Sequence, residues 1–196
     1  MDFLTALWLP IVVSAVIVFV ASAITWMASP LHKHDYKDPG DKEETILGML
    51  RAGGFAPGVY FVPWCKGAKD KNAETAAKMK QGPWAMLTVM GEPPNFGRSL
   101  AMWFVNLLLI SLFVAYVAHN AGLPNGANYL TIFRVAGAAA FLGYAGYAIP
   151  LSTWHALPWS QLPGRLIDGA IYSVLTAGTF GWLWPDAAAK IPAIGG

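Results

Sequence analysis

The chain has 196 residues, of which 56% are hydrophobic and only 12% are charged. Charged residues make up about a quarter of a typical soluble domain, so this composition argues against a soluble protein and indicates one that partitions into a membrane. The net charge of +2 comes from bases interleaved with acids, a pattern that gives no nucleic-acid-binding footprint, and the single cysteine excludes an intramolecular disulfide.

Four apolar runs predict four transmembrane helices. The first, at residues 3–28, carries no charge and would be about 39 Å long as a helix, enough to cross the hydrocarbon core of a bilayer. The others lie near residues 100–118, 130–149 and 166–184. The expected fold is therefore an all-α membrane protein with transmembrane helix 1 in residues 1–30, an aqueous insertion in residues 31–98, and helices 2–4 in residues 99–196.

Basic residues predict the orientation of these helices. The loop at residues 119–128 carries no Lys or Arg, whereas the insertion and the connection before the last helix are basic: Lys33, Lys37, Lys42, Arg51, Arg98 and Arg165. Because Lys and Arg concentrate on the cytoplasmic side of membrane proteins, we expect a cytoplasmic insertion. Both termini and the 119–128 loop would then lie outside.

The insertion is expected to be a small α+β unit of short helices and a two-stranded hairpin. Asp41 and Glu44 have capping-box spacing ahead of an apolar stretch that ends at a Gly pair, which predicts a short helix. Residues 59–64 and 84–90 read as two strands that pair as a hairpin. Between them, residues 72–81 combine the candidate cap Asn72 with helix formers and an acid–base pair four residues apart, Glu74 and Lys78.

This unit has too few apolar positions for a core of its own, and an isolated hairpin is marginal in water. We therefore expect it to lie against the membrane face or a partner.

Within the membrane, small residues in the third and fourth runs, including the pair Ala139 and Gly143, predict close packing between those helices. Tryptophans near the ends of the runs are expected to form interfacial belts, with Trp26 and Trp103 at the inner boundary.

Three polar residues lie within the apolar runs. Asn106 is expected to donate an interhelical hydrogen bond. Arg134 lies about 9 Å inside the outer end of the third run, a depth from which its side chain can reach the surface. Asp168 begins the fourth run at the inner side, where a carboxylate favours the helix N-terminus and can meet the guanidinium of Arg165. The expected topology separates Arg134 from Asp168.

His32, His34 and Asp35 follow the first run. In an extended segment both imidazoles would point the same way, and two nitrogens with one carboxylate would suit zinc or iron. The alternative is that both are interfacial histidines near lipid headgroups. His119 and His155 are expected at opposite membrane faces, which disfavours a haem held by two histidines. No catalytic motif for nucleotide hydrolysis, serine hydrolysis or zinc proteolysis occurs, and no cofactor is expected.

Six sequence motifs resemble those of a group of bacterial integral membrane proteins of unknown function. They lie at residues 29–36 (SPLHKHDY), 57–63 (PGVYFVP), 82–84 (GPW), 158–159 (PW), 168–172 (DGAIY) and 180–185 (FGWLWP). The resemblance covers nearly the whole chain. It implies a bacterial inner-membrane setting and no particular chemistry.

These observations favour a non-enzymatic role, as an accessory or scaffold subunit of a larger inner-membrane complex, since anchoring and packing positions abound and reactive groups are few. The expected partners are the lipid bilayer and either other membrane subunits or further copies of the chain. The first alternative is a homo-oligomeric transporter or channel for a small solute or ion, with Asn106, Arg134 and Asp168 along its path. The weaker alternative is a membrane metalloenzyme that uses His32, His34 and Asp35.

Overall fold

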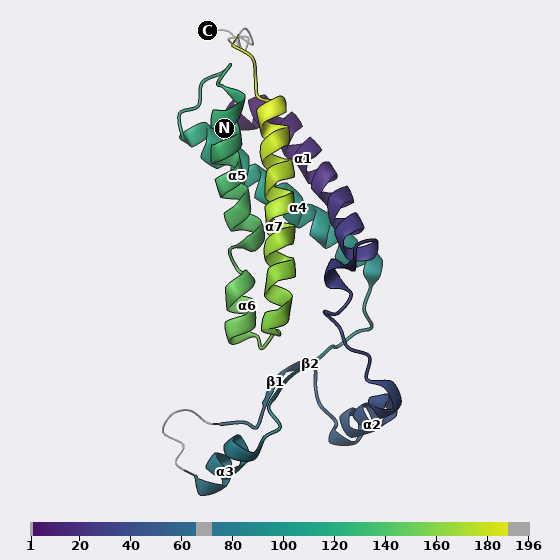
Figure 1. The fold of residues 1–196 in the computed structure, drawn as a ribbon. Coiled ribbons are helices and arrows are strands. Elements are labelled where there is room, and N and C mark those ends of the chain that lie inside the picture. The colour runs from purple at the N-terminus through teal and green to yellow at the C-terminus, as the bar shows by residue number, and fades with distance from the viewer. Residues whose placement is uncertain (1, 66–71, 188–196) are drawn as a thin grey trace.

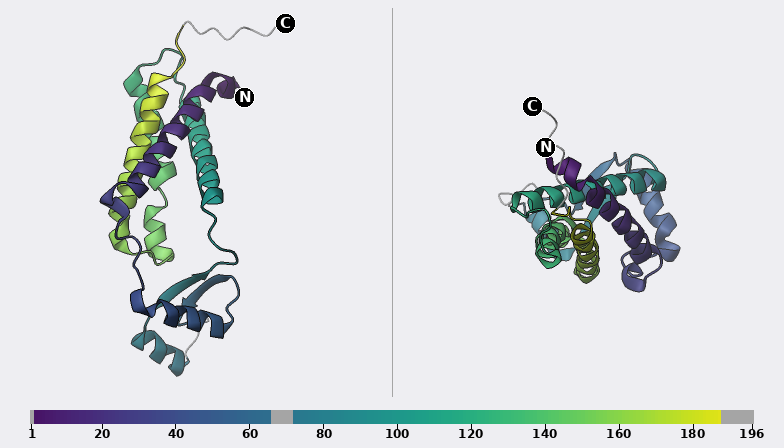
Figure 2. Two further views of the ribbon diagram at one scale, coloured as in Figure 1. Left: turned by 90° about the vertical axis from the view of Figure 1, so that its right-hand side faces the viewer. Right: turned by 90° about the horizontal axis from the view of Figure 1, so that it is seen from above.

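The computed structural model describes residues 2–65 and 72–187, which form a helical bundle with a smaller unit at one end (Figure 1). The bundle contains five helices: α1 (Asp2–Met27), α4 (Phe96–Asn120), α5 (Tyr129–Ala145), α6 (Ala148–Trp154) and α7 (Leu162–Trp182). The start of α1 and the end of α7 lie at the end of the bundle opposite the insertion (Figures 1 and 2). The expected helical fold with a small α+β insertion is therefore confirmed.

Three stretches of helix in the described chain are long and apolar enough to cross a membrane: Phe3–Met27, Phe96–Asn120 and Tyr129–Trp154. The fourth run does form a helix, α7, but this helix is not among the three. Its sequence explains why, since five polar or charged residues lower its hydropathy: Arg165, Asp168, Ser173, Thr176 and Thr179. The side chains of the last four are buried within the bundle.

The third run is interrupted, although the sequence predicted one continuous helix over residues 130–149. Helix α5 ends at Ala145, and α6 begins at Ala148 after a turn at Gly146 and Tyr147. Pro150, in the first turn of α6, has no N–H to donate, and its ring would collide with the carbonyl of residue 146 in a continuous helix. The helix therefore breaks four residues before this proline.

Helices α5 and α7 lie side by side and share the most extensive helix pairing of the bundle (Figure 1). Glycines permit this approach, because a Cβ added at Gly169 would lie 2.6 Å from Ala145 Cβ and one added at Gly137 would lie 3.3 Å from Ala177 Cβ. The close contact predicted between the third and fourth runs is confirmed. Helix α1 packs across α4 and α7, with Ser14 Oγ donating a hydrogen bond to Ser111 Oγ over 3.0 Å.

The insertion contains α2 (Glu43–Gly53), β1 (Gly58–Val62), α3 (Ala73–Gln81) and β2 (Ala85–Val89). The two strands pair antiparallel, as predicted, and Tyr60 lies opposite Leu87. In α3, the side chain of Asn72 accepts a hydrogen bond from the Glu74 N–H, which confirms the predicted cap.

The capping box predicted for the first helix of the insertion is wrong. Asp41 belongs to a separate 3₁₀ turn, Gly40–Lys42, and α2 starts after Lys42 without a side-chain cap. The C-terminal end agrees with the sequence, because Gly54 adopts the left-handed conformation that ends a helix.

Candidate functional site

The segment that leaves α1 turns back into the bundle and buries a histidine. Ser29 begins a 3₁₀ turn, Pro30–His32, in which its hydroxyl accepts a hydrogen bond from the Leu31 N–H. This turn directs the His32 side chain inward, and only 4% of that side chain remains exposed. Gly164 in the first turn of α7 makes room for the ring, since a Cβ at this position would lie 3.4 Å from His32 Cε1.

Both ring nitrogens of His32 contact carboxylates. Nδ1 lies 2.8 Å from Asp35 Oδ2, and Nε2 lies 2.9 Å from Asp168 Oδ2 on α7. A neutral imidazole can donate from only one nitrogen. Two hydrogen bonds therefore require either a charged imidazolium between two carboxylates or a neutral imidazole with one protonated carboxyl group. Both arrangements hold the same number of protons and carry a net charge of −1.

Trp26 and Gln161 complete this arrangement, which we call the His32 cluster (Trp26, His32, Asp35, Gln161 and Asp168). The Trp26 ring stacks on the imidazole with centroids 3.9 Å apart, and its Nε1 donates a hydrogen bond to Asp168 Oδ2 over 3.1 Å. Gln161 Nε2 donates to the backbone oxygen of Asp35 over 2.5 Å. The cluster thus fastens the first residues of the insertion to both the end of α1 and the start of α7.

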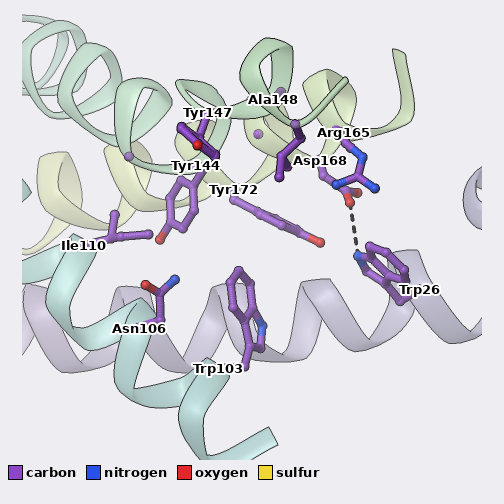
Figure 3. A pocket seen from close by; sticks show the side chains of 13 residues that line it. Trp26, Trp103, Asn106, Ile110, Tyr144, Tyr147, Ala148, Arg165, Asp168 and Tyr172 are labelled. Atoms are coloured by element: carbon purple, nitrogen blue, oxygen red, sulfur yellow. Dashed lines mark hydrogen bonds between the residues drawn. The ribbon is translucent and has the colours of Figure 1, made fainter. Parts of the chain in front are cut away.

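A cavity of about 250 Å³ adjoins the cluster, between α1 and helices α4 to α7 (Figure 3). Its wall combines aromatic rings with a few polar groups; the lining residues are Trp26, Trp103, Asn106, Ile110, Gly143, Tyr144, Tyr147, Ala148, Leu151, Arg165, Asp168, Gly169 and Tyr172. Two buried atoms of these residues, Asp168 Oδ1 and Arg165 Nε, have no hydrogen-bond partner among the described residues. Both atoms have almost no accessible surface, so they lie behind the surface that faces the cavity.

Asp168 does not meet Arg165, so the predicted interaction between them is wrong. The carboxylate is held instead by His32 and Trp26, whereas Arg165 Nη2 donates to Gln161 Oε1 over 2.7 Å. Two tryptophans of the expected inner belt also make hydrogen bonds within the bundle. Besides the bond that Trp26 donates to Asp168, Trp103 Nε1 donates to Ser22 Oγ over 2.9 Å. The belt itself stays a prediction.

The structure separates the three residues of the predicted metal site. His34 is exposed, His32 and Asp35 contact each other, and the turn replaces the extended segment that the prediction assumed. Across residues 2–65 and 72–187, no group of three or more His, Cys, Asp or Glu side chains is arranged to hold a metal ion. Metal binding by His32, His34 and Asp35 stays a prediction.

The other two intramembrane candidates lie apart from the His32 cluster. Asn106 of α4 lines the far wall of the cavity (Figure 3), and the described residues give it no hydrogen bond, so the expected interhelical bond is absent. Arg134 of α5 is exposed on a groove between α5 and α7 whose floor consists mainly of small residues. No ion pair in the described part of the chain joins Arg134 to Asp168.

Sequence reasoning missed the pairing of His32 with Asp168, two residues 136 positions apart. The signal was available in the predicted topology, which placed both residues at the inner ends of their helices. Comparisons of the chain with models of protein families, with curated proteins and with solved structures return no match. The case for a function therefore rests on the geometry of this chain.

Proposed function

We propose that the chain is a non-enzymatic subunit of a larger complex in a bacterial inner membrane, and that its insertion, on the cytoplasmic side, binds a partner subunit. The observation that carries the proposal is the exposure of the insertion. None of its described residues between 33 and 97 is buried. A folded unit without a buried residue requires another surface against which to place its apolar side chains.

The exposed apolar side chains are large enough to support binding. On and next to the two strands, four of them are more than half exposed, at 65% for Val59, 69% for Trp64, 61% for Trp84 and 64% for Met90. Full burial of one such side chain contributes about 1.5–3 kcal/mol, so four contribute roughly 6–12 kcal/mol before the cost of association. That cost, about 4–15 kcal/mol, is of the same size. These four side chains alone would thus give little net affinity, and confinement of both partners to one membrane plane would have to lower the cost of association.

The His32 cluster supports this role, because it fixes the start of the insertion to the bundle. His32 and Asp35 contact α7 and the segment before it, and Trp26 closes the cluster from α1. A partner bound to the insertion would therefore be held at a defined position relative to the membrane helices.

Extraction in a mild detergent, followed by mass analysis of the native assembly, tests the proposal. We expect a complex with a second kind of subunit. Joint replacement Trp64→Ala and Met90→Ala should release that subunit, whereas Trp159→Ala, a 59%-exposed tryptophan outside the insertion, should not. A solitary monomer under mild conditions would contradict the proposal.

A second candidate is transport or conduction of a small solute or ion by a homo-oligomer. The observation that favours it is the cavity, which carries Asn106 and Asp168 on opposite walls. Flux into liposomes tests it, with Asp168→Asn for the cavity and Arg134→Ala for the groove between α5 and α7. Unchanged flux in both variants would remove these residues from the path. The metalloenzyme alternative requires a stoichiometric metal, which elemental analysis of the purified protein would detect.

A further inference from the structure

The groove between α5 and α7 has an unpaired cation at one end. Its volume is about 290 Å³, and its lining residues are Phe133, Arg134, Gly137, Ala138, Phe141, Ala170, Ser173, Val174 and Ala177. Arg134 is exposed and has no hydrogen bond or ion pair among the described residues. The hydroxyl of Ser173 donates to the backbone oxygen of Gly169, so every other side chain of the lining is apolar or already paired.

The groove runs along the two helices rather than across them. Its residues on α5 recur at intervals of three or four from Arg134 to Phe141, and those on α7 recur in the same way from Ala170 to Ala177. This spacing follows one face of each helix over about 10 Å. A Cβ added at Gly137 would lie 3.3 Å from Ala177 Cβ, so these two positions lie at the same level. The groove therefore starts at a guanidinium and continues along apolar side chains toward the insertion side of the bundle.

Arg134 needs a counter-charge that the bundle does not supply. It lies within Tyr129–Trp154, a stretch apolar enough to cross a membrane, and arginine keeps its charge in proteins. A charge at such a position is costly unless it is paired or reaches the membrane surface. Helices α4 to α7 contain a single acid, Asp168, which His32 and Trp26 already bind near the insertion. The counter-charge must then come from outside these helices.

A phospholipid has an anionic group and an apolar chain in the order in which the groove could accept them. Its phosphate can accept two parallel hydrogen bonds from a guanidinium. The length of the groove, about 10 Å, is less than half of a hydrocarbon core that is about 30 Å thick, so one leaflet contains it. Phe141 and Val174, which are 41% and 56% exposed, border the small residues of the floor. An acyl chain in the groove would therefore contact protein atoms on several sides.

We propose that this groove binds one anionic phospholipid in the leaflet opposite the insertion, with the phosphate at Arg134 and one acyl chain along the groove. A headgroup that also carries an ammonium group would bring a second cation near Arg134, whereas a headgroup with a net negative charge would not. The proposal requires α5 and α7 to lie in the membrane and does not depend on what the insertion binds. Its failure would leave the partner-binding role of the insertion untouched.

Titration of the delipidated full chain in detergent micelles tests the proposal, with native mass spectrometry as the readout. The two probes are phosphatidylglycerol, whose headgroup has a net negative charge, and phosphatidylcholine with the same acyl chains. We expect a site that saturates at one phosphatidylglycerol per chain. Phosphatidylcholine should bind to it about tenfold or more weakly.

Two substitutions separate recognition of the headgroup from recognition of the chain. Arg134→Gln should remove the preference for phosphatidylglycerol, whereas Ala138→Leu should fill the groove and weaken binding of both lipids about tenfold or more. Both residues are exposed, so the bundle should still fold. The matched controls are Arg51→Gln in the insertion and Ala101→Leu on α4, which are exposed and outside the groove and should change neither affinity.

A phosphatidylglycerol with a photoactivatable group in its acyl chain locates the site in the same protein. Cross-links should map to residues 134–141 and 170–177. Cross-links confined to other faces of the bundle would overturn the proposal. So would binding that does not saturate, equal affinities for the two lipids, an unchanged preference in Arg134→Gln, or unchanged affinities in Ala138→Leu.

Discussion

Replacement of His32 by alanine should strongly destabilise the base of the bundle. The imidazole is 4% exposed and contacts two carboxylates, whose side chains are 10% exposed at Asp35 and 9% exposed at Asp168. Removing it leaves two buried acids facing each other across a cavity. Two hydrogen bonds to charged groups contribute about 1.5–3 kcal/mol each, and the stacked tryptophan adds about 0.5–1.5 kcal/mol.

These contributions sum to roughly 3.5–7.5 kcal/mol. Broken buried ion pairs cost about 3–5 kcal/mol. Because Asp35 lies at the edge of the cluster, where water can enter the space left by the ring, we expect a loss of about 3–5 kcal/mol in the free energy of unfolding for His32→Ala.

The assay is equilibrium unfolding in mixed detergent micelles, with His34→Ala as the matched control. His34 is two residues further along and exposed, so its replacement should change the free energy of unfolding by no more than about 0.5 kcal/mol. Limited proteolysis should also cut the first residues of the insertion faster in His32→Ala. Equal stability of the two variants would refute the anchoring role of the cluster.

Two further predictions concern the packing of α7 and the charge pair of α3. Gly169→Ala should lower the free energy of unfolding by about 1–3 kcal/mol, because the added Cβ would lie 2.6 Å from Ala145 Cβ. Gly178→Ala should not lower it, because its Cβ would meet only the Tyr129 hydroxyl at 3.6 Å. The same unfolding assay compares the two variants. Lys78 lowers the pKa of Glu74 through a 2.6 Å hydrogen bond, so Lys78→Gln should raise that pKa in an NMR titration. In the unchanged protein, the stability that this pair contributes to α3 should be lost as the pH falls through the lowered pKa of Glu74.

The sequence predicted the helices and strands well because their signals are local. Long apolar runs, a Gly pair after a helix and an Asn before one each act through neighbouring residues, and each reappears in the structure. The break between α5 and α6 could also have been predicted, since Pro150 directly follows the third run. Hydropathy alone does not reveal the break, because the apolar run continues across it without a charged residue.

The candidate site was harder to predict because its contacts are tertiary. In an extended chain the side chains of His32 and His34 would point the same way, but the 3₁₀ turn buries His32 and leaves His34 exposed. Trp26 has the sequence position of an interfacial anchor, and that position does not reveal that its ring stacks on His32. Arg165 was the nearest partner for Asp168 along α7, yet residues from outside that helix took its place. The spacing of residues along one helix shows which side chains of that helix lie close together. It gives no information about which side chains of other segments pack against them.

The proposed role depends on a predicted arrangement of four crossings with the insertion on the cytoplasmic side. Labelling of single cysteines by a membrane-impermeant maleimide tests it most directly, in a Cys65→Ser background, at Glu74, Ala121, Ser160 and Asp186, all exposed in the structure. In intact cells we expect labelling at positions 121 and 186 only, with positions 74 and 160 reacting after permeabilisation. Labelling of positions 160 and 186 from the same side would show that α7 does not cross the membrane and would contradict the account.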